Sequence, residues 1–159
     1  TLADIFGNNT YQPKGFGPVR WMQDGNSYST LESDSAVGGT DIVRYDARTG
    51  ARSVLVSARQ LIPEGTRKPL QVDDYQWSAD GARLLIFTNT RRVWRYRTRG
   101  DYWVLDLHTG ALHQLGTTVD RTTMKFAKFS PDGSRVAFVS KRNICVENLD
   151  TWKTTQITH

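Results

Sequence analysis

Two short turn motifs recur along this chain of 159 residues, and their regular spacing constrains the fold more than any other feature. The first motif is an aromatic residue followed closely by Asp-Gly, at 21–25, 77–81 and 129–133. The three Asp-Gly pairs lie 56 and 52 residues apart. Short apolar alternations flank the copies, and glycine supplies the positive φ of a tight turn, so each copy predicts a β-hairpin.

The second motif is Asp or Asn followed three residues later by Thr, and it keeps step with the first. It occurs at 46–50, 106–110 and 148–152, and a short β-like run follows each copy, at 53–57, 112–115 and 154–158. Each repeat therefore predicts four strands, and four strands at a period of about 50 residues are typical of a propeller blade. A β-sandwich with similarly spaced turns is the alternative, but two motifs in register in three copies favour the propeller.

We therefore expect an all-β fold, a partial β-propeller of about three four-stranded antiparallel blades. The predicted blades cover 19–57, 74–116 and 124–159, after a lead-in segment at 1–18. The composition agrees, because 3 Glu and 6 Lys are few for a helical protein and 17 aromatic residues suit strands. A closed propeller needs roughly four to eight blades, so we expect the chain to be the opening part of a longer ring.

The long connections of the predicted blades all open on one side. They are 33–40, 58–73 and 89–100, whereas the opposite side has only tight turns. Long loops gathered on one face indicate that this face binds the ligand. The formal net charge of +5 points to the same place, because five arginines and no acid lie within nine residues, at Arg91, Arg92, Arg95, Arg97 and Arg99.

Three interpretations of this arginine segment are open. In the first, the arginines bind nucleic-acid phosphates while Trp94 and Tyr96 stack on bases. In the second, the segment is a solvated hairpin extension with Trp94 packed on the sheet. In the third, one or two specific arginines hold a carboxylate or carbonyl oxygen of a ligand or peptide. Nucleic acid is the least favoured, because the cluster is short and the rest of the chain is near charge balance.

The sequence offers no residue for nucleophilic, metal or cofactor chemistry. His108, His113 and His159 have no metal-ligand spacing, and there is no Gly-x-Ser-x-Gly and no phosphate-binding glycine loop. Cys145, the single cysteine, lies in an apolar alternation and is expected in the core. We predict no metal, no cofactor and no catalytic residue in this chain.

The remaining sequence features do not indicate a functional site. Asp74, Asp80 and Asp132 are expected at turns and strand ends, where their side chains accept hydrogen bonds from the backbone. Asn8-Asn9-Thr10 fits a glycosylation acceptor, a pattern that also arises often by chance. The longest apolar stretches have four residues, far below the ~20 that span a bilayer, so no membrane span is expected. The first residues also lack the basic and apolar regions of a signal peptide.

Several segments together resemble the N-terminal propeller of the dipeptidyl peptidase IV family. In the second predicted blade they are 74–81, 84–90, 93–95 and 102–106, and in the third they are 129–139 and 143–146. The Ser-Pro-Asp-Gly turn alone occurs in many propellers, whereas a Trp-Arg element between two strands of this blade is more specific. The resemblance covers roughly residues 4–159.

The resemblance implies an eight-bladed propeller that caps an α/β-hydrolase domain with a Ser-Asp-His triad. Such enzymes release N-terminal dipeptides with proline or alanine as the second residue. An arginine of their Trp-Arg element contacts a substrate carbonyl oxygen, and by motif it is Arg95, the one substrate-binding residue predicted here. The family's pair of amine-binding glutamates has no counterpart, because Glu32, Glu64 and Glu147 are isolated in the sequence. The resemblance places that pair beyond His159.

By this resemblance the parent protein is a serine-type dipeptidyl peptidase, periplasmic or secreted, and the chain itself lacks the triad and is inactive alone. The implied partners are peptide substrates, the C-terminal α/β-hydrolase domain of the same protein and, in a homodimer, a second copy. Nucleic acid is not among them. The alternative function is a non-enzymatic β-propeller that binds a peptide or protein.

Overall fold

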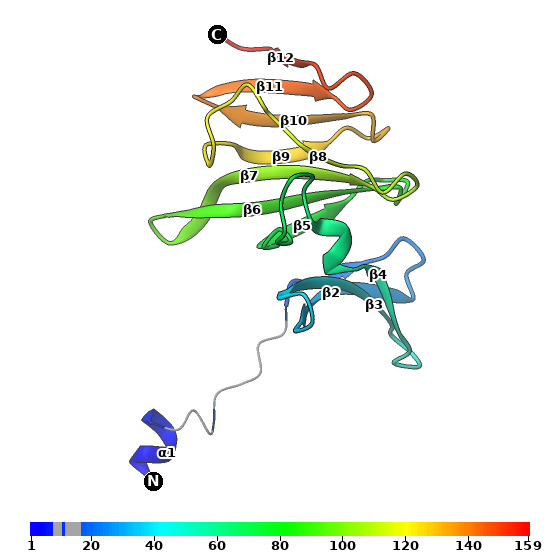
Figure 1. Cartoon of the computed structure of the whole chain (residues 1–159), viewed down its shortest axis with the longest axis vertical. Coiled ribbons are helices and arrows are strands. Elements are labelled where there is room, and N and C mark those ends of the chain that lie inside the picture. Colours follow the sequence, from blue (N-terminus) through cyan, green and yellow to red (C-terminus); the bar gives the residue numbers. More distant parts are fainter. Residues whose placement is uncertain (8–10, 12–16) are drawn as a thin grey trace.

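The computed structural model describes residues 1–7, 11 and 17–159, and three four-stranded antiparallel sheets make up most of it (Figure 1). The strands of each sheet pair in chain order, so each sheet is a meander, here called a blade. The first blade holds β1 (Arg20–Trp21), β2 (Ser27–Asp34), β3 (Gly39–Asp46) and β4 (Arg52–Val56). The second holds β5 (Asp74–Trp77), β6 (Arg83–Val93), β7 (Tyr96–Asp106) and β8 (Leu112–Gln114). The third holds β9 (Lys125–Phe129), β10 (Arg135–Ser140), β11 (Asn143–Asn148) and β12 (Thr154–Gln156).

The predicted all-β fold with three four-stranded antiparallel blades is confirmed. Figure 1 shows the second blade between the other two along the long axis of the molecule. Two short helical elements accompany the strands in the described residues, α1 (Leu2–Phe6) and the 3-10 helix η1 (Ala58–Leu61). Neither is long and apolar enough to cross a membrane. The glycosylation pattern at Asn8–Thr10 lies outside the described residues.

The second turn motif makes the same hydrogen bonds in all three blades, which explains why it repeats. Asp46 Oδ1 accepts from the backbone N–H of Arg48 at 3.0 Å and from that of Thr49 at 2.6 Å. Asp106 and Asn148 accept the equivalent pairs of bonds in the second and third blades. A short acceptor side chain closes this turn, and in the third blade the uncharged amide of Asn148 does so.

The Asp-Gly turns are closed in a similar way. Asp80 and Asp132 each accept a bond of 3.0 Å from the backbone N–H two residues further on, as predicted. Hydrogen bonds, first of all from the Ser130 hydroxyl, lower the pKa of Asp132 to about 2. Asp74 is the first residue of β5, and its side chain accepts from the backbone N–H of Tyr75 at 2.8 Å, as predicted for a strand end. It also pairs with Arg20 of the first blade at 2.6 Å.

The second blade buries both of its faces, because the other blades pack on either side. Leu84 and Ile86 of β6 belong to a core that also contains Ile42 of the first blade. Leu85, which lies between them in sequence, belongs to a second core with Phe138 of the third blade. A strand that is buried on both faces needs consecutive apolar residues, and this accounts for the apolar run in β6.

Polar side chains also connect the second and third blades. Glu147 of β11 is buried, and its carboxylate accepts from the Gly116 N–H at 2.9 Å and the Thr154 hydroxyl at 2.8 Å. Arg83 of β6 donates to the carbonyl of Gly133 at 2.7 Å. These bonds satisfy the buried Glu147 carboxylate and hold the Asp-Gly turn of the third blade against the second blade, so they stabilise the packing of the two blades.

The connections differ from the prediction of three long loops. Half of segment 33–40 is strand, because β2 ends at Asp34 and β3 begins at Gly39, so a four-residue turn at 35–38 remains. Segment 89–100 is mostly strand and forms the outer part of the β6–β7 hairpin. Antiparallel pairing satisfies backbone groups that a loop would leave to water, so the additional residues lengthen strands. Segment 58–73 is the long connection that remains, and it contains η1.

Candidate functional site

The β6–β7 hairpin projects beyond the other turns on its side of the molecule (Figure 1). Its strands have 11 residues each, and Val93 pairs with Tyr96, so Trp94 and Arg95 form a two-residue turn at the tip. The segment thus forms the hairpin extension of the second interpretation. The prediction that Trp94 packs on the sheet is wrong, because this side chain is 93% exposed.

Arg95 occupies the second position of this turn and is exposed. Within the described part of the chain, no hydrogen bond or ion pair of its side chain is observed. A guanidinium presents five N–H donors in a rigid planar fork. The hairpin therefore carries an arginine at its end whose donors are available to a ligand.

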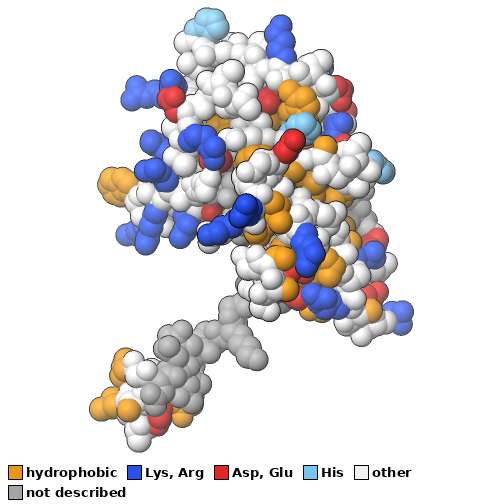
Figure 2. All heavy atoms as spheres, in the orientation of Figure 1, with side chains coloured by type: hydrophobic (Ala, Val, Ile, Leu, Met, Phe, Trp, Pro, Cys, Tyr) orange, Lys and Arg blue, Asp and Glu red, His pale blue; other side chains and the backbone are white. Residues whose placement is uncertain are grey.

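The other arginines of the segment face one another across the hairpin. The opposed pairs are Arg91 with Arg99 and Arg92 with Arg97. Like charges directly across a strand pair are destabilising. Hydrogen bonds within the hairpin nevertheless hold two of these side chains, those of Arg92 and Arg97. Arg97 donates to Thr90 Oγ1 at 2.9 Å and lies 3.5 Å from the carboxylate of Asp73. Arg92 donates to the carbonyl of Trp94 at 3.0 Å. Figure 2 shows Lys and Arg side chains gathered on the side from which the hairpin projects.

A buried carboxylate lies at the base of the hairpin. Asp101 of β7 has a side chain that is 1% exposed. It accepts from the side-chain amide of Asn89 at 2.9 Å, from the Thr122 N–H at 2.6 Å and from Arg121 Nε at 2.8 Å. Burial raises the pKa of Asp101, but the hydrogen bonds lower it more, and the carboxyl pKa lies below its ordinary value. Sequence reasoning missed this residue, because two of its three partners belong to the connection that leads to the third blade.

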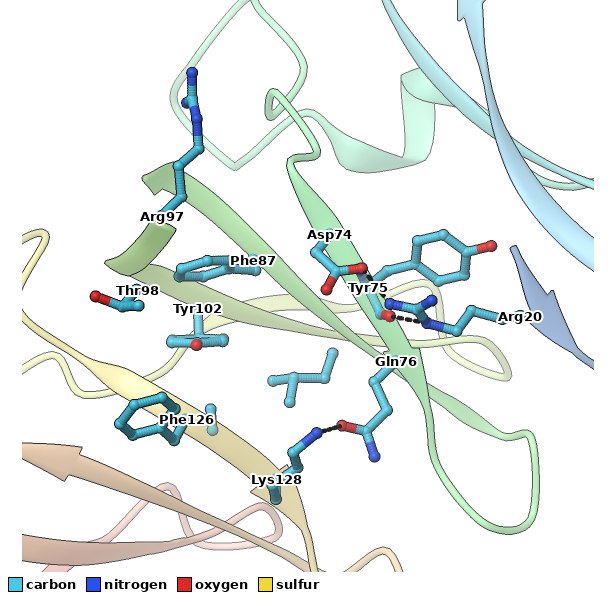
Figure 3. A pocket seen from close by; sticks show the side chains of 12 residues that line it. Arg20, Asp74, Tyr75, Gln76, Phe87, Arg97, Thr98, Tyr102, Phe126 and Lys128 are labelled. Atoms are coloured by element: carbon cyan, nitrogen blue, oxygen red, sulfur yellow. Dashed lines mark hydrogen bonds and ion pairs between the residues drawn. The ribbon is translucent and has the colours of Figure 1, made fainter. Parts of the chain in front are cut away.

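A cleft of about 490 Å³ lies beside the hairpin base, where strands of all three blades approach one another (Figure 3). Arg20 of β1 pairs with Asp74 of β5 at 2.6 Å on one side of it. Lys128 of β9 donates to the amide oxygen of Gln76 at 3.3 Å. Aromatic side chains complete the wall, namely Phe87, Tyr102 and Phe126. Aromatic surface with a few fixed polar groups is typical of ligand pockets.

The remaining candidates have structural roles. Cys145 is buried in the core between the second and third blades, as predicted, and burial raises the pKa of its thiol. His113 stacks on Trp152 with ring centroids 4.1 Å apart, which adds a contact between the same blades. Among residues 1–7, 11 and 17–159, no group of three His, Cys, Asp or Glu side chains is arranged to hold a metal ion. Glu32 lies in β2, Glu64 in the connection between η1 and β5, and Glu147 in β11, so they form no pair.

The repeated blades define a β-propeller, and comparison with known proteins identifies its class. Residues 78–159 match the sequence profile of the dipeptidyl peptidase IV (DPP IV) N-terminal region. The crystal structure of Porphyromonas gingivalis dipeptidyl peptidase 4 superposes with a TM-score of 0.78 at 26% identity, over 96% of this chain and 21% of that one. TolB from Acinetobacter baumannii, with a TM-score of 0.55 at 16% identity, shares the fold alone.

Similar sequences include named peptidases. The chain is 30% identical over 154 residues to dipeptidyl aminopeptidase B of Saccharomyces cerevisiae, which covers 92% of this chain and 17% of the yeast protein. It is 29% identical over 144 residues to prolyl endopeptidase FAP of Homo sapiens, over 91% of this chain and 17% of the human protein. This chain belongs to the dipeptidyl peptidase IV family and forms part of its N-terminal region, which confirms the resemblance. It spans less than a fifth of the length of these two relatives.

Proposed function

We propose that this chain is the N-terminal propeller portion of a serine-type dipeptidyl peptidase that removes N-terminal dipeptides with proline or alanine in the second position. Its place in the family and the names of its relatives support this proposal. The structural observation that carries it is the exposed arginine at the tip of the projecting β6–β7 hairpin. There Arg95 donates charge-assisted hydrogen bonds to a carbonyl oxygen of the bound peptide.

The catalytic triad and the amine-binding glutamates, in this proposal, belong to parts of the protein beyond this chain. The outward faces of the first and third blades agree with a longer ring, because Val54 and Ile144 are 46% and 45% exposed there. Further blades would cover these apolar side chains. A C-terminal α/β-hydrolase domain is the partner of the propeller, a homodimer is the proposed assembly, and the periplasm or the extracellular space is the proposed location.

The proposed role of Arg95 is tested in the full-length protein by Arg95→Ala, with Arg142→Ala as the matched control. Arg142 is also the second residue of a two-residue turn, at the end of the β10–β11 hairpin. Arg95→Ala should lower kcat/KM on a Gly-Pro chromogenic substrate by about 1–3 kcal/mol of transition-state stabilisation. Arg142→Ala should leave it unchanged. Equal kinetics for Arg95→Ala and the wild type, with normal folding, would remove Arg95 from the site.

The isolated chain should not turn over the same substrate, because no nucleophile and base can be assigned in it. Turnover that a serine-directed inhibitor blocks would contradict this expectation. The alternative of a non-enzymatic binding propeller receives no separate support from the TolB comparison, which at 16% identity concerns the fold alone. A full-length protein that binds peptides without hydrolysing them would favour that alternative.

A further inference from the structure

We propose that Asp101 is a positioning residue that fixes the direction in which the Trp94–Arg95 tip leaves the second blade. Its effect on catalysis rests on the proposed function, since it acts through Arg95. Its effect on the hairpin itself does not depend on that function. The contacts of Asp101, the irregular backbone beside it and the length of the hairpin each support the proposal.

The carboxylate of Asp101 joins both strands of the hairpin to the third blade's connection. Its Oδ2 accepts from Asn89 Nδ2 in β6 at 2.9 Å and from Arg121 Nε at 2.8 Å, and its Oδ1 accepts from the Thr122 N–H at 2.6 Å. Arg121 and Thr122 precede β9. One buried side chain thus connects β6, β7 and the segment that leads into the next blade.

The bonds fall where the hairpin changes direction. Thr88 pairs with Asp101, but the next pair joins Arg91 to Arg99, so two residues of β6 oppose one residue of β7. Such a bulge bends the strand and increases its twist. Asn89, the first residue of the bulge, has a φ of 50°, a left-handed conformation that Asn adopts more readily than most residues. The hydrogen bond from its side-chain amide to the Asp101 carboxylate holds this conformation in place.

Close packing at the neighbouring Gly100 restrains the same point. The Gly100 N–H donates to the carbonyl of Met124 in the third blade's connection at 3.1 Å. A Cβ at this position would lie 2.5 Å from the Phe87 ring and 2.6 Å from the Thr88 carbonyl oxygen. The base of the hairpin is therefore held from several directions, whereas its tip is exposed.

The length of the hairpin amplifies small movements at its base. Arg95, in the turn just before β7, lies six residues from Asp101, which is about 20 Å at the ~3.3 Å rise of a strand residue. A tilt of about 3° at the base would then shift the tip by roughly 1 Å, and a misplacement of that size can cost about a hundredfold in rate. The orientation of the hairpin base therefore sets the position of the Arg95 side chain.

Asp101→Asn tests the proposal with little change in shape. An amide has one acceptor oxygen and presents two donors of its own, so it cannot accept from Asn89, Arg121 and Thr122 together. Asn89→Gly is the second variant, because glycine keeps the left-handed backbone and removes a single bond to Asp101. Asp106→Asn is the control, since it makes the same chemical change at the other end of β7, where the third blade has Asn148.

The experiment measures kcat/KM of the full-length protein on a Gly-Pro chromogenic substrate, together with hydrogen exchange of amides 89–100. We expect Asp101→Asn to lower kcat/KM by roughly tenfold to a hundredfold and to speed exchange in the hairpin. Asn89→Gly should have a smaller effect in the same direction, and Asp106→Asn none. In the Arg95→Ala background Asp101→Asn should cost less than about twofold, because two residues that act through one contact are not additive.

The outcomes test separately whether Asp101 anchors the hairpin base and whether it acts on catalysis through Arg95. An equal loss from Asp101→Asn with and without Arg95 would overturn its action through Arg95. Unchanged exchange at 89–100 in both Asp101→Asn and Asn89→Gly would overturn the anchor itself. If Arg95→Ala has no kinetic effect, the proposed function loses its site, and faster exchange in Asp101→Asn would still support the anchor. If Asp101→Asn does not fold, Asn89→Gly decides both parts by the same measurements.

Discussion

The central hairpins of the second and third blades begin alike and end differently. Thr88 pairs with Asp101 at the point where Ser140 pairs with Asn143. In the third blade a two-residue turn follows at once, whereas in the second blade 12 residues, 89–100, intervene. The shared part packs between blades, and the additional part carries the exposed tip. A blade can therefore keep its packed core and gain an exposed, projecting element by lengthening one hairpin.

Replacing residues 89–100 by the two residues of the third blade's turn, Lys-Arg, is expected to give the largest effect. The full-length variant should fold, because both interblade cores lie outside the replaced segment. Its kcat/KM should fall by roughly a hundredfold or more, since the tip arginine and its support are removed together. Full activity of the variant with the short hairpin would show that the outer part of the β6–β7 hairpin is not needed for catalysis.

Gly100→Ala should disturb the hairpin base next most strongly. The new Cβ would meet the Phe87 ring and the Thr88 carbonyl oxygen, and overpacking of this kind costs about 1–3 kcal/mol of unfolding free energy. Denaturant unfolding measures the loss. Phe87→Leu in the Gly100→Ala background should restore part of it by relieving the contact with the ring. An unchanged free energy of unfolding would show that the base yields without strain.

The pH dependence of Asp101 gives a smaller and more specific test. Its carboxyl pKa lies below the ordinary value of 3.8, because hydrogen bonds outweigh the effect of burial. The folded protein therefore binds this proton less readily than the unfolded chain. The contribution to stability is complete above pH 3.8 and is lost as the pH falls through the lower pKa. The difference in Tm between wild type and Asp101→Asn should shrink over that range in thermal unfolding, and a constant difference would contradict the assignment.

Asp106→Asn is expected to have the smallest effect, within about 0.5 kcal/mol of unfolding free energy. The third blade closes the same turn with Asn148, whose amide oxygen accepts from the N–H groups of Asp150 and Thr151 at 2.9 and 2.8 Å. The measurement is again denaturant unfolding. A large loss would mean that the interaction of Asp106 with Arg83, 3.7 Å away, contributes more than the turn itself.

The sequence predicts most of what is local in this fold. Asp-Gly and Asp-x-x-Thr turns are closed by side chains within a few residues, so their spacing is enough to predict the four-stranded blades. Cys145 follows from apolar alternation in the same way. The predicted loop at 89–100 is a hairpin, because propensity does not distinguish exposed strand from loop in a run of Arg and Thr.

The polar support of the site depends on residues that are distant in sequence. Asp101 meets Arg121 and Thr122, 20 and 21 residues away, and Glu147 meets Gly116, 31 residues away. These contacts exist only after blades have packed against each other. A single sequence does not show which of the 13 aspartates will be buried, whereas the Trp-Arg motif could be found because it is contiguous.

A structure of the full-length protein with a slowly cleaved peptide that has proline in the second position would test the central claim most directly. We expect the Arg95 guanidinium at roughly 2.7–3.2 Å from a carbonyl oxygen of the peptide, with Asp101 still bonded to Asn89, Arg121 and Thr122. A bound peptide in the catalytic site, with Arg95 directed to solvent or paired to a carboxylate of the protein, would contradict it.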